Sequence, residues 1–126
     1  MYAVQQLEAY RTVQKTTESG REIEALVLTR AAVKLTEIRN NWDSPDRDAK
    51  LDEALRNNQI IWSIFQGELM KADNPLPRKL KQDILSLSTF IDKRTFEVMA
   101  QPAPDKLEVI INLNLNLAAG LRGQSS

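Results

Sequence analysis

Carboxylates form the densest group of potentially reactive side chains in this 126-residue chain: Asp46, Asp48, Asp52 and Glu53 follow closely on one another. Oxygen ligands of this kind can hold Mg²⁺ or Ca²⁺, but the spacing lacks the central glycine and the distal glutamate of a calcium loop. Carboxylates also suit the first turn of a helix, where the helix dipole is positive. We therefore interpret the cluster as a solvated helix start and predict no metal site.

The one basic cluster consists of Arg78, Lys79 and Lys81. A phosphate-binding face would need aromatic or further basic side chains close by, and the neighbouring sequence supplies none. The whole chain has 17 Lys plus Arg against 17 Asp plus Glu. Binding to phosphates or to an anionic membrane rests on a surplus of positive charge. We therefore expect neither a direct nucleic-acid partner nor a membrane partner.

Histidine and cysteine are both missing from the sequence. Their absence excludes imidazole or thiolate metal ligands, a cysteine nucleophile, a serine–histidine relay and a disulfide framework. No glycine-rich phosphate loop and no nucleophile elbow is present either. The sequence thus predicts a protein that is not an enzyme and has no cofactor, because isolated carboxylates give no convincing acid/base pair.

Helices must position these side chains, because apolar residues recur at spacings of three and four along most of the chain. The length predicts a single domain, residues 1–126, which can bury about two thirds of the surface of its unfolded form. We predict an all-α fold, a small bundle of four main helices with an N-terminal arm or short helix over 1–18 and a frayed tail over 122–126. The main helices are expected over residues 19–42, 45–71, 77–100 and 105–121.

The expected helix ends follow from capping residues and prolines. Ser19 and Glu22 fit a capping box, in which each side chain binds the other's free backbone amide. Ser44 is predicted to cap the second helix, with Pro45 at its first position. Two prolines within residues 75–77 are expected to end the second helix before the third begins. A similar pair within residues 102–104 separates the third helix from the fourth.

The predicted core consists of the apolar stripes of these helices. Trp42 and Trp62 are expected in the core, and Phe90 and Phe96 are expected to widen the stripe of the third helix. Apolar residues and asparagines alternate over residues 109–117, as they would in a strand. Helix is favoured there, because asparagine is a poor strand residue and a lone strand would have nothing to pair with.

Asn58 and Asn114 each interrupt an apolar seam. A buried amide destabilises a core unless it is hydrogen-bonded, so we favour a satisfied core amide or one turned to solvent. The alternative is that such a residue fixes the helix register or receives the backbone of a partner. Apolar rows beside the main seams, as at Ile60 and Ile64, could likewise leave a groove open for another helix, although core filling explains most of them equally well.

Several segments together resemble the FlaF family of alphaproteobacterial flagellar biosynthesis proteins. In chain order the matching residues are Ala9-Tyr10, Arg21 to Glu24, Trp62, Asn74-Pro75-Leu76-Pro77, Leu85 to Ser88, and Ile111 to Asn114 with Asn116 and Ala118 to Leu121. The match spans nearly the whole chain, and the ordered set is more specific than any single piece. Two positions depart from the family pattern: Gly20 stands where proline is expected, and Leu115 stands where a basic residue is often found.

This resemblance implies a cytoplasmic protein that binds flagellin before export and supports its secretion and filament assembly, with a link to the regulator FlbT. Helix-in-groove binding of the terminal helices of flagellin fits the apolar seams. The predicted contacts are Tyr10, Val13, Ile60, Ile64, Phe65, Asn114 and Leu117. The alternative is a post-transcriptional regulator of flagellin synthesis, acting on flagellin mRNA or through FlbT.

The start of the chain agrees with a cytoplasmic location. Residues 1–13 have neither a basic region nor an apolar region of a signal peptide. No apolar run approaches the roughly 20 residues of a membrane span. We therefore expect a soluble cytoplasmic protein.

Overall fold

The computed structural model describes residues 19–124. The elements in this range are α2 (Ser19–Asn40), α3 (Arg47–Leu69), α4 (Arg78–Ala100), the 3₁₀ helix η1 (Pro104–Lys106) and α5 (Leu107–Gln124). The described residues contain no strand, so the predicted all-α bundle is confirmed, and the alternating segment 109–117 is helical. The predictions for residues 1–18 and for the last two residues lie outside the described part of the chain, whereas residues 122–124, predicted as part of a frayed tail, belong to α5.

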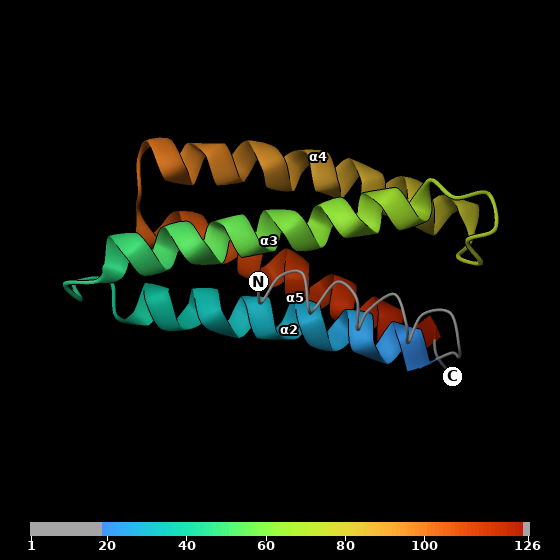
Figure 1. Cartoon of the computed structure of the whole chain (residues 1–126), viewed down its shortest axis with the longest axis horizontal. Coiled ribbons are helices and arrows are strands. Elements are labelled where there is room, and N and C mark those ends of the chain that lie inside the picture. The colour runs from blue at the N-terminus through green and yellow to red at the C-terminus, as the bar shows by residue number, and fades with distance from the viewer. Residues whose placement is uncertain (1–18, 125–126) are drawn as a thin grey trace.

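The helices pack in an order that differs from their order in the sequence. α5 lies closest to α2, α2 also packs against α3, and α3 packs against α4. α4 and α5 approach each other at only a few positions. Figure 1 shows the reason: α5 begins beside the end of α4 and then slants away from it toward the start of α2. The helices therefore pack closely around α2 and less closely between α4 and α5.

Small side chains bring α2 and α5 together. Ala25 and Ala32 of α2 and Ala118 of α5 are all buried, so the two backbones can approach closely. Polar contacts join the two helices near both ends of α5. The Arg39 guanidinium forms an ion pair with Glu108, and Arg122 donates a hydrogen bond to the Thr29 hydroxyl at 3.2 Å.

The core receives side chains from all four described helices. Trp62 is fully buried at its centre, as predicted. Trp42 lies outside a helix, because α2 ends at Asn40, and its half-buried ring packs against the core. The Arg47 guanidinium lies over this ring at 4.2 Å from its centroid, a cation–π contact that holds the turn between α2 and α3.

The predicted cap of α3 is wrong. Ser44 and Pro45 lie in the turn before the helix, which begins at Arg47 with Asp46 at the N-cap position. The Ser44 hydroxyl donates a hydrogen bond to the Asp46 carboxylate instead of accepting one from a helix amide. Because the helix starts two residues later than predicted, Ser44 lies before the N-cap position, where its hydroxyl is close to the carboxylate, a strong acceptor.

Candidate partner-binding surface

The predicted contact residues fall into two environments. Ile60 of α3 is 42% exposed, and Ile64 one turn later is half-buried. Phe65, Asn114 and Leu117 are buried in the bundle, so no partner can reach them while the helices are packed as they are here. The predicted contacts Tyr10 and Val13 lie outside the described residues.

Asn58 and Asn114 form a buried polar junction with Trp62. The Asn114 amide donates to the Asn58 side-chain oxygen at 2.7 Å and, more weakly, to the Leu28 carbonyl at 3.4 Å. Its own side-chain oxygen accepts the Trp62 indole N–H at 3.0 Å. We call Asn58, Trp62 and Asn114 the asparagine junction. It confirms the interpretation of Asn114 as a satisfied core amide, and it ties α5 to both α3 and α2.

The amide nitrogen of Asn58 has no hydrogen-bond partner, although the residue is fully buried. Such an unpaired buried donor destabilises a fold by about 1–3 kcal/mol. The Asn58 side chain is retained in the core by its oxygen alone, which accepts the bond from Asn114. This unpaired donor offsets part of the stabilisation that the three hydrogen bonds of the asparagine junction provide.

α4 is bound to the bundle in a different way. Its buried residues are Ile84, Ser88, Ile91, Thr95 and Val98, a narrow stripe at spacings of four, three, four and three. The Gln66 amide of α3 donates a hydrogen bond to the Ser88 hydroxyl. The Thr95 hydroxyl donates to the Ile91 carbonyl of its own helix at 2.7 Å. Among the described residues, the Gln66–Ser88 bond is the one hydrogen bond between side chains that joins α4 to another helix.

The opposite side of α4 carries two exposed aromatic rings. Phe96 is 67% exposed and Phe90 is 38% exposed, so the prediction that they widen the core stripe is wrong. The buried stripe is narrow, and helical spacing of 100° per residue places both rings about 120° from its centre, on either side of Lys93. Helical spacing in the sequence could have predicted this exposure. Positions 84, 88, 91, 95 and 98, at alternating spacings of four and three, form a narrow seam that excludes both phenylalanines.

We call Phe90, Lys93 and Phe96 the outer face of α4. The Arg94 guanidinium lies 5.7 Å from the centroid of the Phe90 ring and pairs with Glu97 at 3.5 Å. Phe90 is thus partly covered, whereas Phe96 makes no ring contact and no cation–π contact among the described residues. Single exposed apolar residues are ordinary, but two aromatic rings on one helix face are typical of a protein-binding surface.

The three aspartates of the acidic cluster pair with neighbouring cations. Asp46 pairs with Lys50 at 3.1 Å, Asp48 with Arg47 at 2.8 Å, and Asp52 with Arg56 at 2.9 Å. Within residues 19–124 no three potential metal ligands of the Asp, Glu, His or Cys types come together. The hydrogen bond from the Ser44 hydroxyl, together with Lys50, lowers the pKa of the Asp46 carboxyl below its ordinary value of 3.8.

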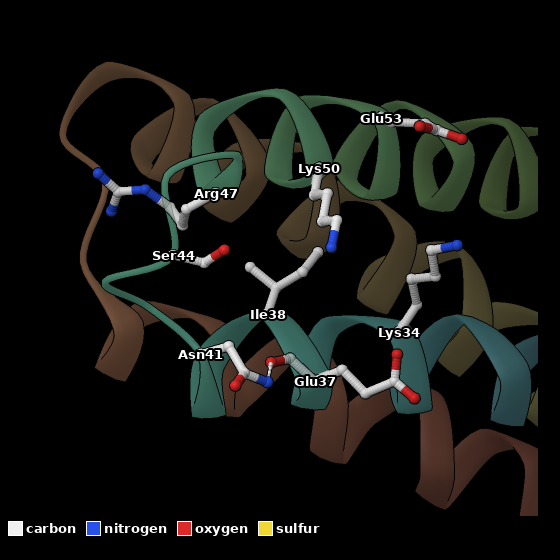
Figure 2. A pocket seen from close by; sticks show the side chains of 8 residues that line it. All are labelled: Lys34, Glu37, Ile38, Asn41, Ser44, Arg47, Lys50 and Glu53. Carbon is white, nitrogen blue, oxygen red and sulfur yellow. Dashed lines mark hydrogen bonds between the residues drawn. The ribbon is translucent and has the colours of Figure 1, made fainter.

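A pocket of about 530 Å³ lies beside this cluster, between the end of α2 and the start of α3 (Figure 2). Lys34 and Lys50 extend into the space from opposite helices, and Ile38 lies between them. Glu37 and Glu53 also line the pocket, so both signs of charge are represented. The lining side chains include neither a nucleophile with an adjacent base nor a run of one charge. This arrangement does not resemble a catalytic site.

None of the helices in the described part of the chain is both long enough and apolar enough to span a membrane.

These features define the protein as a small all-α bundle that presents an aromatic helix face and has no catalytic constellation in the described residues. The family model described as flagellar protein FlaF matches residues 6–121, and the chain therefore belongs to the FlaF family of flagellar proteins. The resemblance noted in the sequence is thus confirmed. No curated protein and no solved structure matches the chain.

Proposed function

We propose that this flagellar protein binds flagellin in the cytoplasm and supports its secretion and filament assembly, without enzymatic activity. The observation that carries the proposal is the outer face of α4, where Phe96 is 67% exposed and Phe90, six residues earlier on the same helix, is 38% exposed. A family of flagellar proteins supplies the context. An exposed aromatic face on a helical bundle suits a helical partner better than a small molecule.

The proposed partner segment is a terminal helix of flagellin. Such helices are expected to assemble with one another in the filament, so their apolar stripes need to be covered before export. An aromatic ring buries about 150–250 Å² when it enters an interface. Phe90 and Phe96 can therefore cover a substantial part of one such stripe. Lys93 between them keeps the free surface hydrated and can pair with a carboxylate of the partner.

Other predicted contacts are compatible with this arrangement. Ile60 is exposed on α3, and Ile64 lies one turn later on the same helix. We propose both as secondary contacts. Tyr10 and Val13 lie outside the described residues and remain predicted contacts.

Co-expression with flagellin followed by size-exclusion chromatography tests the proposal. The expected result is co-elution of the two proteins at micromolar concentration, with a 1:1 or other fixed ratio in the peak. Separate elution at that concentration would contradict direct binding.

A mobility-shift assay with flagellin mRNA tests the alternative role in regulation. A shift by this protein alone that weakens steeply with salt would favour direct RNA binding. With equal numbers of acidic and basic residues, no such shift is expected. Separate pull-downs with flagellin and with FlbT distinguish a chaperone from an adaptor that acts on FlbT alone.

A further inference from the structure

We propose that residues 1–18 fold back along α2 as a helix and occupy a groove between α2 and α3, where they cover Ile60 and Ile64 in the free protein. This occupation does not depend on flagellin, because the contacts lie within one chain. The groove begins at the pocket of about 530 Å³ between the end of α2 and the start of α3.

The pocket is formed where α2 and α3 leave their common turn and run in opposite directions (Figure 1). α2 contributes Lys34, Glu37 and Asn41 to its lining, and α3 contributes Lys50 and Glu53. On each helix these residues lie at spacings of three and four, so they form one seam on each side of the pocket.

The two seams continue along both helices toward the start of α2. At steps of three and four residues they comprise Lys34, Arg30, Val27 and Ile23 on α2, and Glu53, Asn57, Ile60 and Ile64 on α3. The pocket brings the seams together, so two turns further along Val27 comes opposite Ile60. Ile23 and Ile64 follow one turn later. We call Ile23, Val27, Ile60 and Ile64 the apolar part of the groove.

The apolar part of the groove is incompletely covered. Ile60 is 42% exposed, and the other three side chains are half-buried. Helical spacing places Ile60 and Ile64 about 160° round α3 from Trp62, the residue that binds Asn114 of α5. α5 therefore lies on the opposite side of α3 from the groove. α2 and α3 also move apart toward the start of α2 (Figure 1).

Residues 1–18 carry an apolar pattern that suits this groove. Ala3, Leu7, Tyr10 and Val13 recur at spacings of four, three and three, as on one face of a helix. A helix of this length is marginal in water by itself and needs a surface on which to bury that face. Two helices with apolar residues at the same spacing provide such a surface.

The sequence at the start of α2 favours a reversal of the chain. Thr16 and Thr17 precede α2, and Gly20 is its second residue. All three have low helix propensity, so α2 is not expected to continue into the preceding residues. Because the segment is joined to α2, its binding is intramolecular and has a high effective concentration. This connection favours residues 1–18 over a second copy of the chain.

The apolar residues of the segment and the groove come into register after such a reversal. A helix rises about 1.5 Å per residue, so positions equally far from the reversal lie side by side. With the reversal near residue 18, Val13 lies beside Ile23 and Tyr10 lies beside Val27. The Tyr10 ring can then pack on Ile60, and an aromatic ring buries about 150–250 Å² in such a contact.

The segment also brings a carboxylate to two cations. Arg30 and Lys34 form no ion pair with any residue of the described range 19–124. The same register places Glu8 near Arg30, between the apolar part of the groove and the pocket. The charges of segment and groove are thus complementary at this point.

Hydrogen exchange of the full chain tests the occupation of the groove. We expect the amides of residues 7–13 to exchange at least about 10-fold more slowly than those of a synthetic peptide of residues 1–18. The peptide lacks the groove, so it reports the protection that the segment has by itself. Exchange of residues 7–13 at the rate of the peptide would overturn the proposal.

Two matched variants test the location. The exposed fractions of Ile60 and Leu115 are 42% and 41%. Leu115 lies on the same face of α5 as Glu108 and Arg122, which bind α2, so it marks the surface shared by α2 and α5. We expect Ile60→Ser to lower the protection of residues 7–13 at least about 5-fold and Leu115→Ser to change it by less than about 2-fold. A greater loss with Leu115→Ser would place the segment on the α2–α5 surface and overturn the proposal.

Dilution distinguishes binding within one chain from binding between two copies. We expect the same protection of residues 7–13 at about 10 and about 100 μM protein, because an intramolecular contact does not depend on concentration. Protection that falls on dilution would show that the segment binds a second copy, and would overturn the proposal.

The outcomes for this inference and for the proposed function are separate. Unprotected residues 7–13 in the free protein would overturn the occupation of the groove, and co-elution with flagellin would still support the proposed function. Failure to co-elute with flagellin would contradict the proposed function, whereas protection that is lost in Ile60→Ser and kept in Leu115→Ser would still support the occupation of the groove.

Discussion

The two helices that close the bundle, α5 and α4, are held in contrasting ways. α5 packs along α2 over small side chains and is joined to its neighbours by the asparagine junction and an ion pair. α4 packs mainly on α3 through a narrow stripe in which two of the five buried residues are polar. α4 also exposes two of the three phenylalanines of the chain. The difference indicates that α2 with α5 supplies stability, whereas α4 supplies a surface that can adapt.

Truncation of a buried aliphatic side chain should show the largest contrast. Leu28 of α2 and Ile91 of α4 are both fully buried. We expect Leu28→Ala to lower the free energy of unfolding by about 4 kcal/mol and Ile91→Ala by about 2 kcal/mol, because the loosely held α4 can move to close the cavity. Urea unfolding measures both values. An equal or greater loss for Ile91→Ala would contradict the comparison.

Loss of a buried polar contact should likewise lower the free energy of unfolding more in α5 than in α4. Asn114→Ala leaves the Trp62 indole N–H and the Asn58 amide oxygen without a partner in the core. We expect it to cost about 2–3 kcal/mol of unfolding free energy. Ser88→Ala removes a hydroxyl that binds the partly buried Gln66 side chain, which can turn to water. The expected cost of Ser88→Ala is about 1 kcal/mol of unfolding free energy. A larger cost than that of Asn114→Ala would contradict the conclusion that α5 is held more firmly than α4.

The ion pair on the α2–α5 surface should contribute little. Arg39 and Glu108 are both partly exposed, and exposed pairs contribute about 0–1 kcal/mol. We expect Glu108→Ala to reduce the melting temperature slightly at low salt and to have no effect near 1 M salt, where screening is strong. A loss that persists at high salt would show that Glu108 acts through packing instead of charge.

The smallest predicted effect concerns acid stability at the turn before α3. The pKa of Asp46 is lower in the folded protein, so its ionised form favours folding. This contribution to stability is fully present when the pH is above 3.8, the ordinary pKa of the group. It is lost as the pH falls from 3.8 through the lower pKa of the folded protein. Asp46→Asn should therefore lower the melting temperature slightly at pH 6 and leave it unchanged near pH 2. A greater effect at pH 2 than at pH 6 would contradict this sign.

Much of the fold could be predicted from the sequence, because apolar spacing and the proline pairs are local signals. The helical state of residues 109–117 followed from the lack of a strand to pair with. The cap of α3 could not be predicted, since the Ser44 hydroxyl can either accept a bond from a helix amide or donate one to the Asp46 carboxylate, and only the turn geometry decides. The asparagine junction joins residues 56 positions apart, so no local pattern reveals that Asn58 and Asn114 meet.

The candidate surface was harder to predict than the fold. Phe90 and Phe96 were assigned to the core because they are apolar, although helical spacing places both about 120° from the centre of the buried stripe of α4. Two of the five stripe positions, Ser88 and Thr95, are polar, so apolar residues alone do not mark its centre. Phe65 and Leu117 were predicted as contacts because they are apolar, yet the same property places them inside.

Flagellin affinity of two matched variants tests the division between α4 and the α2–α5 pair most directly. Phe96→Ser removes an exposed apolar side chain from α4, and Val33→Ser removes one, 50% exposed, from α2. Both variants should fold like the unmodified protein, because neither side chain is buried. We predict that Phe96→Ser weakens flagellin binding at least about 10-fold, a loss of about 1.4 kcal/mol, while Val33→Ser leaves it unchanged within about 2-fold. Equal affinities for both variants, or a greater loss for Val33→Ser, would contradict the role assigned to α4.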